Sequence, residues 1–595
     1  MSAYLPPLRD MEFVLRDLAG LAEIAALPGY EEASSELVSS VLEEAGHIAE
    51  EVLAPLNQTG DRQGARLQDG KVLTADGWAA AYKTLVDGTW IGLSADPEYG
   101  GMGLPGLVSA AVNEMWQAAN MAFSLCPMLT QGALNAISEC GSPEQKALFL
   151  PKLISGEWAG TMNLTEASAG SDLGAIRTKA VRSGEHYLIS GQKIFITYGD
   201  QDLTENIIHL VLARTPDAPA GVKGISLFLV PKFLVNADGS LGAHNDVHCV
   251  SLEHKLGIHA SPTAVLSFGD QGGSIGYLVG QENRGLEYMF VMMNHARLNV
   301  GLQGLAIAER SYQQAVGYAR ERIQGKPLGG NDRTGIIDHP DVRRMLMTMK
   351  AQIEAMRALA YVAAAALDKA HATADEEGRA AALKFAELLN PVVKGWCTEI
   401  GNEVASLGVQ IHGGMGYIEE TGACQHLRDA RITTIYEGTT GIQANDLVNR
   451  KIMRDKGASA QAAIATVDAL AVQLGKESDP TLKAIGQQLA VGADNARTAV
   501  AWVVASAAED PRLPAAAAVP LLYLMGTVLG GHQLARSAQI ARQRLDAGEG
   551  DPAFWDAKMK TALHFALCLM PKASSYLAHI TEGSRTVMAL SAEQF

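Results

Sequence analysis

The segment His186–Thr197, HYLISGQKIFIT, decides what kind of domain occupies the middle of this chain. It is apolar and rich in β-branched residues, and similar runs follow it at short intervals: IIHLVLAR (207–214), ISLFLVP (225–231) and AVLSFG (264–269). Gly, Asp and Pro separate these runs, a pattern that is typical of strands joined by turns. We therefore expect a compact β domain, a barrel or a sandwich, over residues 161–281.

On both sides of this segment the apolar residues recur at helical spacing. Before it, SSELVSSVLEEAGHIAEEVLAPLN (34–57) predicts a helix that Pro55 ends, and Ser142 before Pro143 predicts a helix start. After it come long alanine-rich runs, in which Asp479-Pro480, Asp510-Pro511 and Asp551-Pro552 mark further helix starts. The fold class is therefore α+β with several domains: an N-terminal helical domain (1–160), the β domain (161–281), a C-terminal helical bundle (282–450) and an additional helical domain (451–595).

The composition is that of a folded protein with an acidic surface. Apolar residues make up 48% of the 595 residues, and the formal net charge is −17. Nucleic acids and anionic membranes require clustered Lys and Arg, so neither is expected as a partner. An anionic substrate would need local basic groups to hold it against this overall charge.

The cysteines and the apolar stretches favour a soluble, cytoplasmic protein. The six cysteines are widely spaced without a C-x-x-C pair, which fits reduced thiols. The N-terminal sequence lacks the basic start and apolar core of a signal peptide. The stretch Ala515–Gly531 is shorter than the roughly 20 residues that a membrane-spanning helix needs, and it contains Pro520.

Two motif-like segments carry no chemistry in this interpretation. Gly101-Met-Gly103-Leu-Pro-Gly106 has a proline inside and no acidic residue at the distance that a dinucleotide fingerprint requires, so we predict a plain turn. His244 and His248 would lie about 13 Å apart along an extended strand, too far to share a metal ion unless a loop brings them together. With Cys249 beside them, they are taken as ordinary surface residues, and no metal site is expected.

Two polar segments suit a flavin. In MNLTEASAGSDLGAIRTK (162–179), small residues flanked by Thr165 and Asp172 form a tight loop that lets N–H and hydroxyl groups approach a ring or a phosphate. In GQKIFITYG (191–199), Phe195 and Thr197 lie on one face of a strand, so that an aromatic ring stands beside a hydroxyl. Taken singly, a turn and ordinary core packing explain these segments equally well.

Two later segments add a glycine pair and a carboxylate. In QIHGGMGY (410–417), Gly413 and Gly414 cap a helix and would also let a diphosphate approach the backbone. In RDARITTIYEGTTGIQ (428–443), Glu437 follows the apolar Ile435-Tyr436 pair. A carboxylate in an apolar pocket has a raised pKa, which suits a general base. An isolated Y-E-G triplet would instead be a solvated glutamate at a helix start.

In this order, the four segments resemble the acyl-CoA dehydrogenase family. TEASAGSD is similar to T-E-P-x-A-G-S-D, KIFIT to K-x-W-I-T, and the last two segments to Q-x-x-G-G-x-G-Y and R-D-A-x-I-x-x-I-Y-E-G-T-x-x-I-Q. The resemblance covers about residues 35–450, and the part after 451 resembles the extended members of the family. Ala167 replaces the usual proline and Phe195 the usual tryptophan, and both substitutions keep the character of their segment.

The resemblance implies a role for particular residues. Glu437 is the implied catalytic base, and the alternative position of some relatives is Ala296 here, which cannot serve. Arg297, Ser171 and Gly438 are implied to bind the substrate. The implied FAD-binding residues include some that reach the FAD of a partner subunit (Arg322, Gln410, Gly413 and Gly414), and the others are Leu164, Thr165, Ser171, Phe195, Thr197 and Thr439.

The resemblance also implies the reaction and its partners. Glu437 removes the α-proton of an acyl-CoA while a hydride leaves the β-carbon for flavin N5, and a trans-2-enoyl-CoA results. Electrons then pass to an electron-transfer flavoprotein, and the enzyme is a homodimer. An acyl-CoA oxidase that uses O₂ is the alternative within the fold. A non-catalytic flavin-fold protein is the third possibility, and its expected mark is loss of the base.

Overall fold

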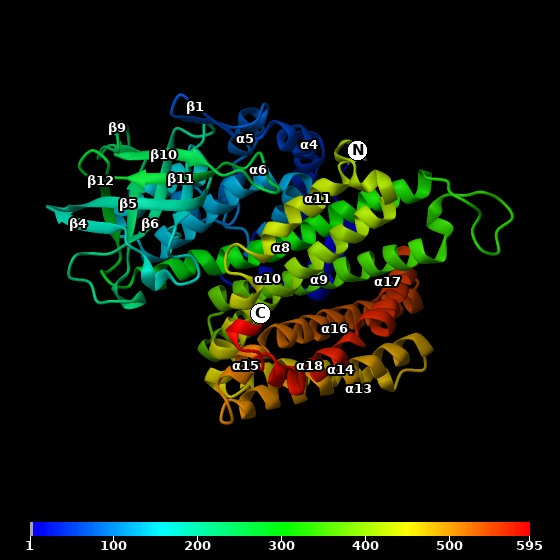
Figure 1. Ribbon diagram of the computed structural model, residues 1–595. Coiled ribbons are helices and arrows are strands. Elements are labelled where there is room, and N and C mark those ends of the chain that lie inside the picture. Colours follow the sequence, from blue (N-terminus) through cyan, green and yellow to red (C-terminus); the bar gives the residue numbers. More distant parts are fainter. Residues whose placement is uncertain (1–3) are drawn as a thin grey trace. The chain divides into compact units, whose positions relative to one another are not determined.

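The computed structural model describes residues 4–595, which divide into two compact units (Figure 1). The β unit comprises residues 45–105 and 115–299. The helical unit comprises residues 4–44, 106–114 and 300–595. The long helices α6 (Gly106–Cys140) and α8 (Gly285–Glu321) contribute to both.

An eight-stranded curved sheet forms the β unit, in the order β10-β11-β5-β12-β7-β6-β3, with β4 paired to β5 (Figure 1). All pairs are antiparallel except β3 with β6. Every residue of β6 and β7 is buried, as their mostly apolar sequences favour. The strands are β3 (Trp158–Asn163), β4 (Lys179–Ser183), β5 (His186–Thr197), β6 (Asn206–Ala213), β7 (Ser226–Pro231), β10 (Val247–Leu252), β11 (Thr263–Phe268) and β12 (Ser274–Val279).

The long strand β5 makes the sheet curl. Its first half pairs with β4 and β12, and its second half, from Gly191 onward, pairs with β11. Two small hairpins accompany the sheet, β1 (Arg66–Gln68) with β2 (Lys71–Leu73) and β8 (Phe233–Val235) with β9 (Leu241–His244). The four runs quoted from the sequence are therefore strands of one curled sheet, and the predicted β architecture of the central region is confirmed.

Helices α4 (Ala54–Gln63), α5 (Trp78–Asp87) and α7 (Pro143–Ser155) complete the β unit. Ser142 caps α7 with a reciprocal hydrogen-bonded pair to Gln145, as predicted. The expectation that Pro55 ends a helix was wrong. A π-helical turn, Ile48–Leu53, follows α3 (Ser35–His47), and Pro55 then lies in the first turn of α4, where a missing N–H costs nothing.

In the helical unit, the long helices α9 (Pro340–Ala372) and α10 (Glu376–His412) pack against each other. Asp479 and Asp551 cap α14 and α17 as predicted, whereas α15 begins one residue later than expected, at Arg512. The remaining helices are α1 (Leu8–Phe13), α2 (Leu21–Ala25), α11 (Ala423–Ala430), α12 (Thr440–Asn445), α13 (Ala458–Gly475), α14 (Pro480–Ser506), α15 (Arg512–Ala516), α16 (Ala518–Ala547), α17 (Pro552–His564) and α18 (Lys572–Thr581).

Glycines let α16 approach α10 closely within this unit. A Cβ atom added to Gly526 would lie 2.2 Å from the Trp396 ring, and one added to Gly530 would lie 2.8 Å from the same ring. Trp396 is 2% exposed, so the C-terminal helices share a core with the bundle. The α+β fold class is confirmed, and no helix in residues 4–595 is long and apolar enough to span a membrane.

A buried ionic network joins five segments of the helical unit. The Arg357 guanidinium, 1% exposed, donates to Glu114 at 2.6 Å, to Glu309 at 2.7 Å and to Asp10. Lys558 of α17 donates to Asp10 as well, and to Glu354 at 3.0 Å. Burial acts to raise the pKa of Asp10, but Lys558 and Arg357 outweigh it and hold that pKa well below its ordinary value. The network therefore fixes the N-terminal segment and α17 to the bundle.

Replacing Arg357 by methionine is expected to lower the free energy of unfolding by about 3–5 kcal/mol, because carboxylates stay buried without their cation. Urea titration followed by tryptophan fluorescence measures this change. The matched control is Arg379→Met, which removes an ion pair whose arginine side chain is 47% exposed. It should change stability by less than about 1 kcal/mol. Equal effects of the two variants would contradict the role of the network.

Candidate functional site

In the β unit, a buried ion pair ties the loop after β3 to strand β5. The Lys193 ammonium, in a side chain with no exposed surface, donates to the Glu166 carboxylate at 2.8 Å and to the Leu164 carbonyl at 3.0 Å. Burial lowers the pKa of Lys193 to about 8, although Glu166 opposes this shift. The Thr165 carbonyl accepts from the Ile194 N–H at 2.9 Å. Leu164 and Thr165 thus lie beside β5, next to Phe195.

Glu166 and Ala169 close the loop on itself. Each backbone N–H donates to the other residue's carbonyl at 3.0 Å. The Glu166 carboxylate also accepts from the N–H groups of Arg177 and Thr178. Burial acts to raise its pKa, but Lys193 and these hydrogen bonds outweigh burial and lower it. The small residues of this segment therefore form the tight polar loop that was predicted, with Ser171 exposed at its end.

Phe195 stands at a bulge in β5. Its φ is +60°, in the left-handed region, and the register to β11 shifts between Ala264 and Leu266. Its ring is 58% exposed, and the partly exposed Thr197 follows beyond the buried Ile196. Phe195 is thus accessible and Thr197 partly so. The bulge itself was not predicted.

In the helical unit, Glu437 lies in a short loop between η10 (Arg431–Thr434) and α12. Its φ is +54°, an uncommon conformation for a residue with a side chain, and its surface is partly exposed. Gly438 follows with φ +89°, and a Cβ there would lie 2.7 Å from Gln443 Nε2. Thr439 caps α12 by accepting from the Ile442 N–H at 3.3 Å. The backbone around Glu437 is therefore tightly constrained.

Lys394 and Gln443 hold this loop in place. The Lys394 ammonium, fully buried in α10, donates to the Thr433 carbonyl at 2.8 Å and to the Gly438 carbonyl at 2.7 Å. Gln443 Nε2 donates to the carbonyls of Glu437 at 3.0 Å and Gly438 at 3.2 Å. Both ends of the loop that carries Glu437 are thus tied to the interior.

Two consecutive glycines directly after α10 leave the backbone there uncovered by side chains. Gly413 caps α10 with φ +60°, as predicted, and a Cβ at Gly413 or Gly414 would meet no described atom within 4 Å. Gln410, one turn earlier, is exposed, and so is Arg322, which directly follows α8. Each of these groups is therefore accessible without displacement of the core.

Arg297 lies inside α8 and is 4% exposed, with its guanidinium 5.8 Å from the centre of the Phe290 ring. The structure therefore groups the predicted residues in two sets. The β unit contains Leu164, Thr165, Ser171, Phe195, Thr197 and Arg297. The helical unit contains Arg322, Gln410, Gly413, Gly414, Glu437, Gly438 and Thr439. Their individual roles stay predictions.

Sequence reasoning missed Lys193, Glu166, Lys394 and Gln443, which position the predicted residues. A signal for Lys394 was present, because a lone lysine interrupts the apolar run PVVKGWC (391–397). A buried lysine needs hydrogen-bond acceptors, and carbonyls of a neighbouring loop are suitable ones.

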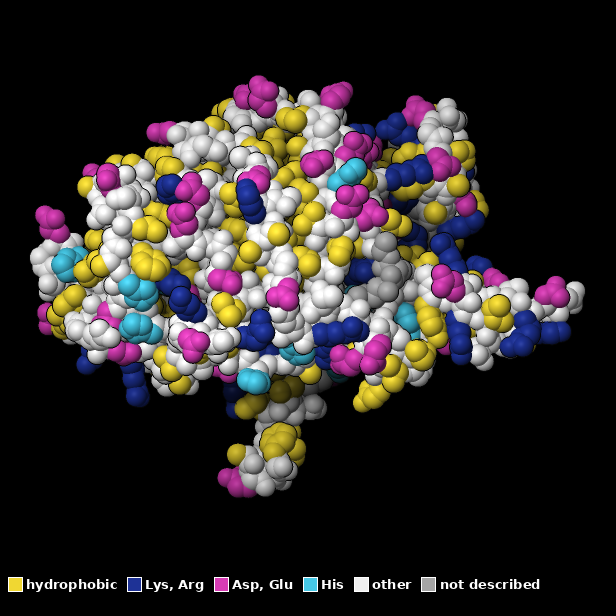
Figure 2. All heavy atoms as spheres, turned by 90° about the horizontal axis from the view of Figure 1, so that it is seen from above, with side chains coloured by type: hydrophobic (Ala, Val, Ile, Leu, Met, Phe, Trp, Pro, Cys, Tyr) yellow, Lys and Arg dark blue, Asp and Glu magenta, His cyan; other side chains and the backbone are white. Residues whose placement is uncertain are grey.

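The histidines dismissed as metal ligands lie closer together than expected. The chain turns between β9 and β10, so the rings of His244 and His248 stack with centres 5.8 Å apart, where an extended strand had predicted about 13 Å. Within residues 4–595, no group of three His, Cys, Asp or Glu side chains is placed to hold a metal ion. On the face seen in Figure 2, acidic and basic side chains are interspersed.

Comparison with known proteins identifies the family. Models of the acyl-CoA dehydrogenase N-terminal, middle and C-terminal domains match residues 36–157, 161–271 and 283–453, and a model described as acetyl-CoA dehydrogenase C-terminal like matches residues 459–591. The 3-methylmercaptopropionyl-CoA dehydrogenase of Ruegeria pomeroyi is 49% identical over 591 residues, which are 99% of this chain and 100% of that protein. The chain belongs to the acyl-CoA dehydrogenase family.

Solved structures agree with this assignment. An acyl-CoA dehydrogenase from Bacillus anthracis, complexed with FAD, shares the fold with a TM-score of 0.74 over 98% of this chain and 93% of its own, at 21% identity. A chain in a structure of the electron transferring flavoprotein of Acidaminococcus fermentans gives a TM-score of 0.59 at 28% identity, covering 70% of this chain and 98% of that one. The predicted reaction class and cofactor are confirmed: the enzyme is an acyl-CoA dehydrogenase, an oxidoreductase that uses FAD.

Replacing Lys394 by methionine is expected to lower the free energy of unfolding by about 2–4 kcal/mol, because two buried carbonyls lose their charged donor. Amide hydrogen exchange in residues 433–439 should also become faster. The matched control is Lys384→Met, which changes an exposed lysine of the same helix and should cost less than about 0.5 kcal/mol. Unchanged exchange in that loop would show that Lys394 does not hold it.

Proposed function

We propose that the enzyme converts an acyl-CoA to its trans-2-enoyl-CoA, with Glu437 as the base that removes the α-proton. The placement of Glu437 carries this proposal. Lys394 holds both ends of its loop through Thr433 and Gly438, Gln443 donates to the Glu437 carbonyl, and Glu437 itself adopts a positive φ. A rigid backbone presenting one carboxylate is what a general base requires, because proton transfer depends on geometry first and pKa second.

The residues present fit FAD. An exposed aromatic ring at Phe195, beside the Thr197 hydroxyl, suits a flat apolar ring system that also needs hydrogen bonds. Backbone with open space at Gly413 and Gly414 suits a diphosphate. FAD, when bound, accepts the hydride that leaves the β-carbon of the substrate. Leu164, Thr165 and Ser171 would complete the ring site and Thr439 would contact the diphosphate, while Arg322, Gln410, Gly413 and Gly414 would reach the FAD of a partner subunit.

The chain's own groups make the α-proton removable. A thioester α-proton is a very weak acid, so a carboxylate alone is not enough, and the developing negative charge on the thioester oxygen needs an aimed donor. The backbone N–H of Glu437 supplies that donor. The same residue thus gives the base and the donor, and the constraint on its backbone fixes the two relative to each other. Arg297, Ser171 and Gly438 border the bound acyl-CoA.

The favoured substrate is 3-methylmercaptopropionyl-CoA, and a short or medium straight-chain acyl-CoA ranks second. Support comes from the full-length match to the Ruegeria pomeroyi enzyme at 49% identity. The electron acceptor is an electron-transfer flavoprotein, supported by the likeness to a chain of the Acidaminococcus fermentans structure. The compartment is the cytoplasm, where the six free thiols remain reduced.

The enzyme acts as a homodimer in this proposal. Large apolar side chains are exposed directly after the glycine pair, with Tyr417 at 85%, Met415 at 47% and Ile418 at 44% exposure. Leu328, in the loop after α8, is 89% exposed. Clustered exposed apolar side chains are typical of interfaces, and a second subunit would cover them.

The variant Glu437→Gln is expected to keep its FAD and lose turnover by about 10²–10⁴-fold, because the amide has the shape of the carboxylate but cannot take a proton. Steady-state assays, together with the flavin absorbance of the purified variant, measure both quantities. The control Glu185→Gln, an exposed carboxylate in the β4–β5 turn, should leave turnover unchanged. Full activity of Glu437→Gln would remove this residue from the mechanism.

Anaerobic titration with acyl-CoAs identifies the substrate. Loss of flavin absorbance is expected to be faster with 3-methylmercaptopropionyl-CoA than with pentanoyl-CoA, the matched compound in which a methylene replaces the sulfur. Faster bleaching by pentanoyl-CoA would overturn the substrate while leaving the reaction intact. The same reduced samples test the acceptor, since rapid re-oxidation by O₂ would indicate an acyl-CoA oxidase instead.

A further inference from the structure

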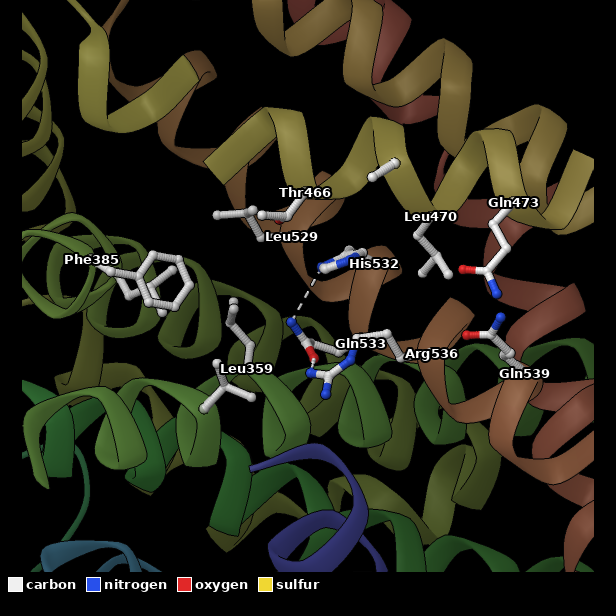
Figure 3. A pocket seen from close by; sticks show the side chains of 13 residues that line it. Leu359, Phe385, Thr466, Leu470, Gln473, Leu529, His532, Gln533, Arg536 and Gln539 are labelled. Atoms are coloured by element: carbon white, nitrogen blue, oxygen red, sulfur yellow. Dashed lines mark hydrogen bonds between the residues drawn. The ribbon is translucent and has the colours of Figure 1, made fainter. Parts of the chain in front are cut away.

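A cavity of about 400 Å³ lies inside the helical unit, between the bundle and the C-terminal helices (Figure 3). Helices α9 and α10 line one side of it, and α13 and α16 line the other. Its volume is within the range of roughly 300–1,000 Å³ that is usual for sites holding small molecules. None of the residues assigned above to FAD or to acyl-CoA lines it.

The cavity is a local feature of an otherwise tight interface. Close by on α16, the contacts of Gly526 and Gly530 with Trp396 leave no room for even a Cβ atom. Leu359 and Leu529, which line the cavity, are 1% and 3% exposed. A loosely packed interface would show gaps along its whole length, whereas here close packing stops where the polar residues of α16 begin.

One cation faces this cavity. Among its lining residues, all within the described chain, Arg536 alone carries a permanent charge. The Arg536 guanidinium donates to Gln533 Oε1 at 2.7 Å and to the Leu18 carbonyl at 3.1 Å, so two of its five N–H donors are used. Both acceptors are neutral. Burial lowers the pKa of Arg536, and the nearby Glu23, which opposes this shift, is exposed and paired with Lys369 at 2.6 Å.

The guanidinium is held ready for an anion. Gln533, whose side chain is 4% exposed, accepts from Arg536 through Oε1, and its amide nitrogen lies 3.4 Å from His532 Nδ1 (Figure 3). Hydrogen bonds thus link His532, Gln533 and Arg536 beside the cavity. A fixed guanidinium with unused donors in a half-buried setting matches the geometry of a carboxylate.

Apolar residues line one end of the cavity, and two glutamines line the other end. Phe385 and Leu359 lie toward one end in Figure 3, whereas Gln473 and Gln539 face each other at the other end. Leu389 and Leu470 add further apolar surface. A ligand that fits has a single anionic head and an alkyl tail. A phosphate-rich molecule does not fit, because one arginine among apolar walls cannot neutralise several charges.

We propose that this cavity binds a medium-chain aliphatic carboxylate, with its head group on Arg536 and its chain along Leu359, Phe385, Leu389 and Leu529. The carboxylate neutralises the half-buried guanidinium and takes up its unused donors. The chain removes apolar side chains of α9, α10 and α16 from water. The site is separate from catalysis and does not depend on the function proposed above.

Calorimetric titration of the FAD-loaded enzyme with octanoate tests this site. We expect one site per chain, and binding that weakens by about 10- to 100-fold in Arg536→Gln, as loss of a charged hydrogen bond predicts. The matched control is Arg542→Gln, a residue of the same helix that pairs with Asp546 and does not line the cavity. It should bind octanoate as the wild type does.

A second ligand and a second variant test the site even if Arg536→Gln is unstable. Octan-1-ol, which lacks the charge, should bind the wild type at least about tenfold more weakly than octanoate. Val362→Phe places a ring in the cavity from α9 and should abolish binding while the enzyme keeps its FAD. Equal binding of octanoate and octanol, unchanged binding in both variants, or no saturable binding at roughly 1 mM would each overturn the proposal.

Discussion

The buried ammonium of Lys394 is the contact on which the helical part of the site depends. It donates to the carbonyls of Thr433 and Gly438, at the two ends of the loop that carries Glu437. A loop that holds the non-glycine residue Glu437 at a positive φ is strained and would relax if it were free. A charged donor inside a helix that is itself buried prevents this relaxation. The loop is therefore held by α10 as well as by Gln443 of its own segment.

The next two residues of α10 attach the C-terminal helices. A Cβ atom at Gly395 would lie 2.7 Å from Leu522, and the Trp396 ring packs against Gly526 and Gly530 of α16. One turn of α10 thus contacts the Glu437 loop through Lys394 and the C-terminal helices through Gly395 and Trp396. The C-terminal helices contribute to the environment in which the catalytic loop is held, and the Arg357 network, which reaches Lys558 of α17, adds a second attachment.

Local signals predicted the parts of the structure that local chemistry determines. The strand His186–Thr197, the cap of α7 at Ser142, the caps at Asp479 and Asp551 and the helix end at Gly413 all follow from residues adjacent in sequence. Non-local contacts determine what was missed. The bulge at Phe195 depends on pairing with β11, and the role of Lys394 depends on a loop about 40 residues later, which periodicity cannot reveal. The prediction that Pro55 ends a helix failed because a π-helical turn precedes Pro55, which then lies in the first turn of the next helix.

The position of Glu437 relative to a bound thioester tests the account most directly. A crystal structure of the FAD-loaded enzyme with an acyl-CoA that cannot be oxidised would give the distance from the Glu437 carboxylate to the α-carbon. The account predicts roughly 3–3.5 Å, the separation from which a proton can be transferred, with the Lys394 contacts to Thr433 and Gly438 unchanged. A Glu437 side chain turned toward solvent, with another base at the α-carbon, would contradict it.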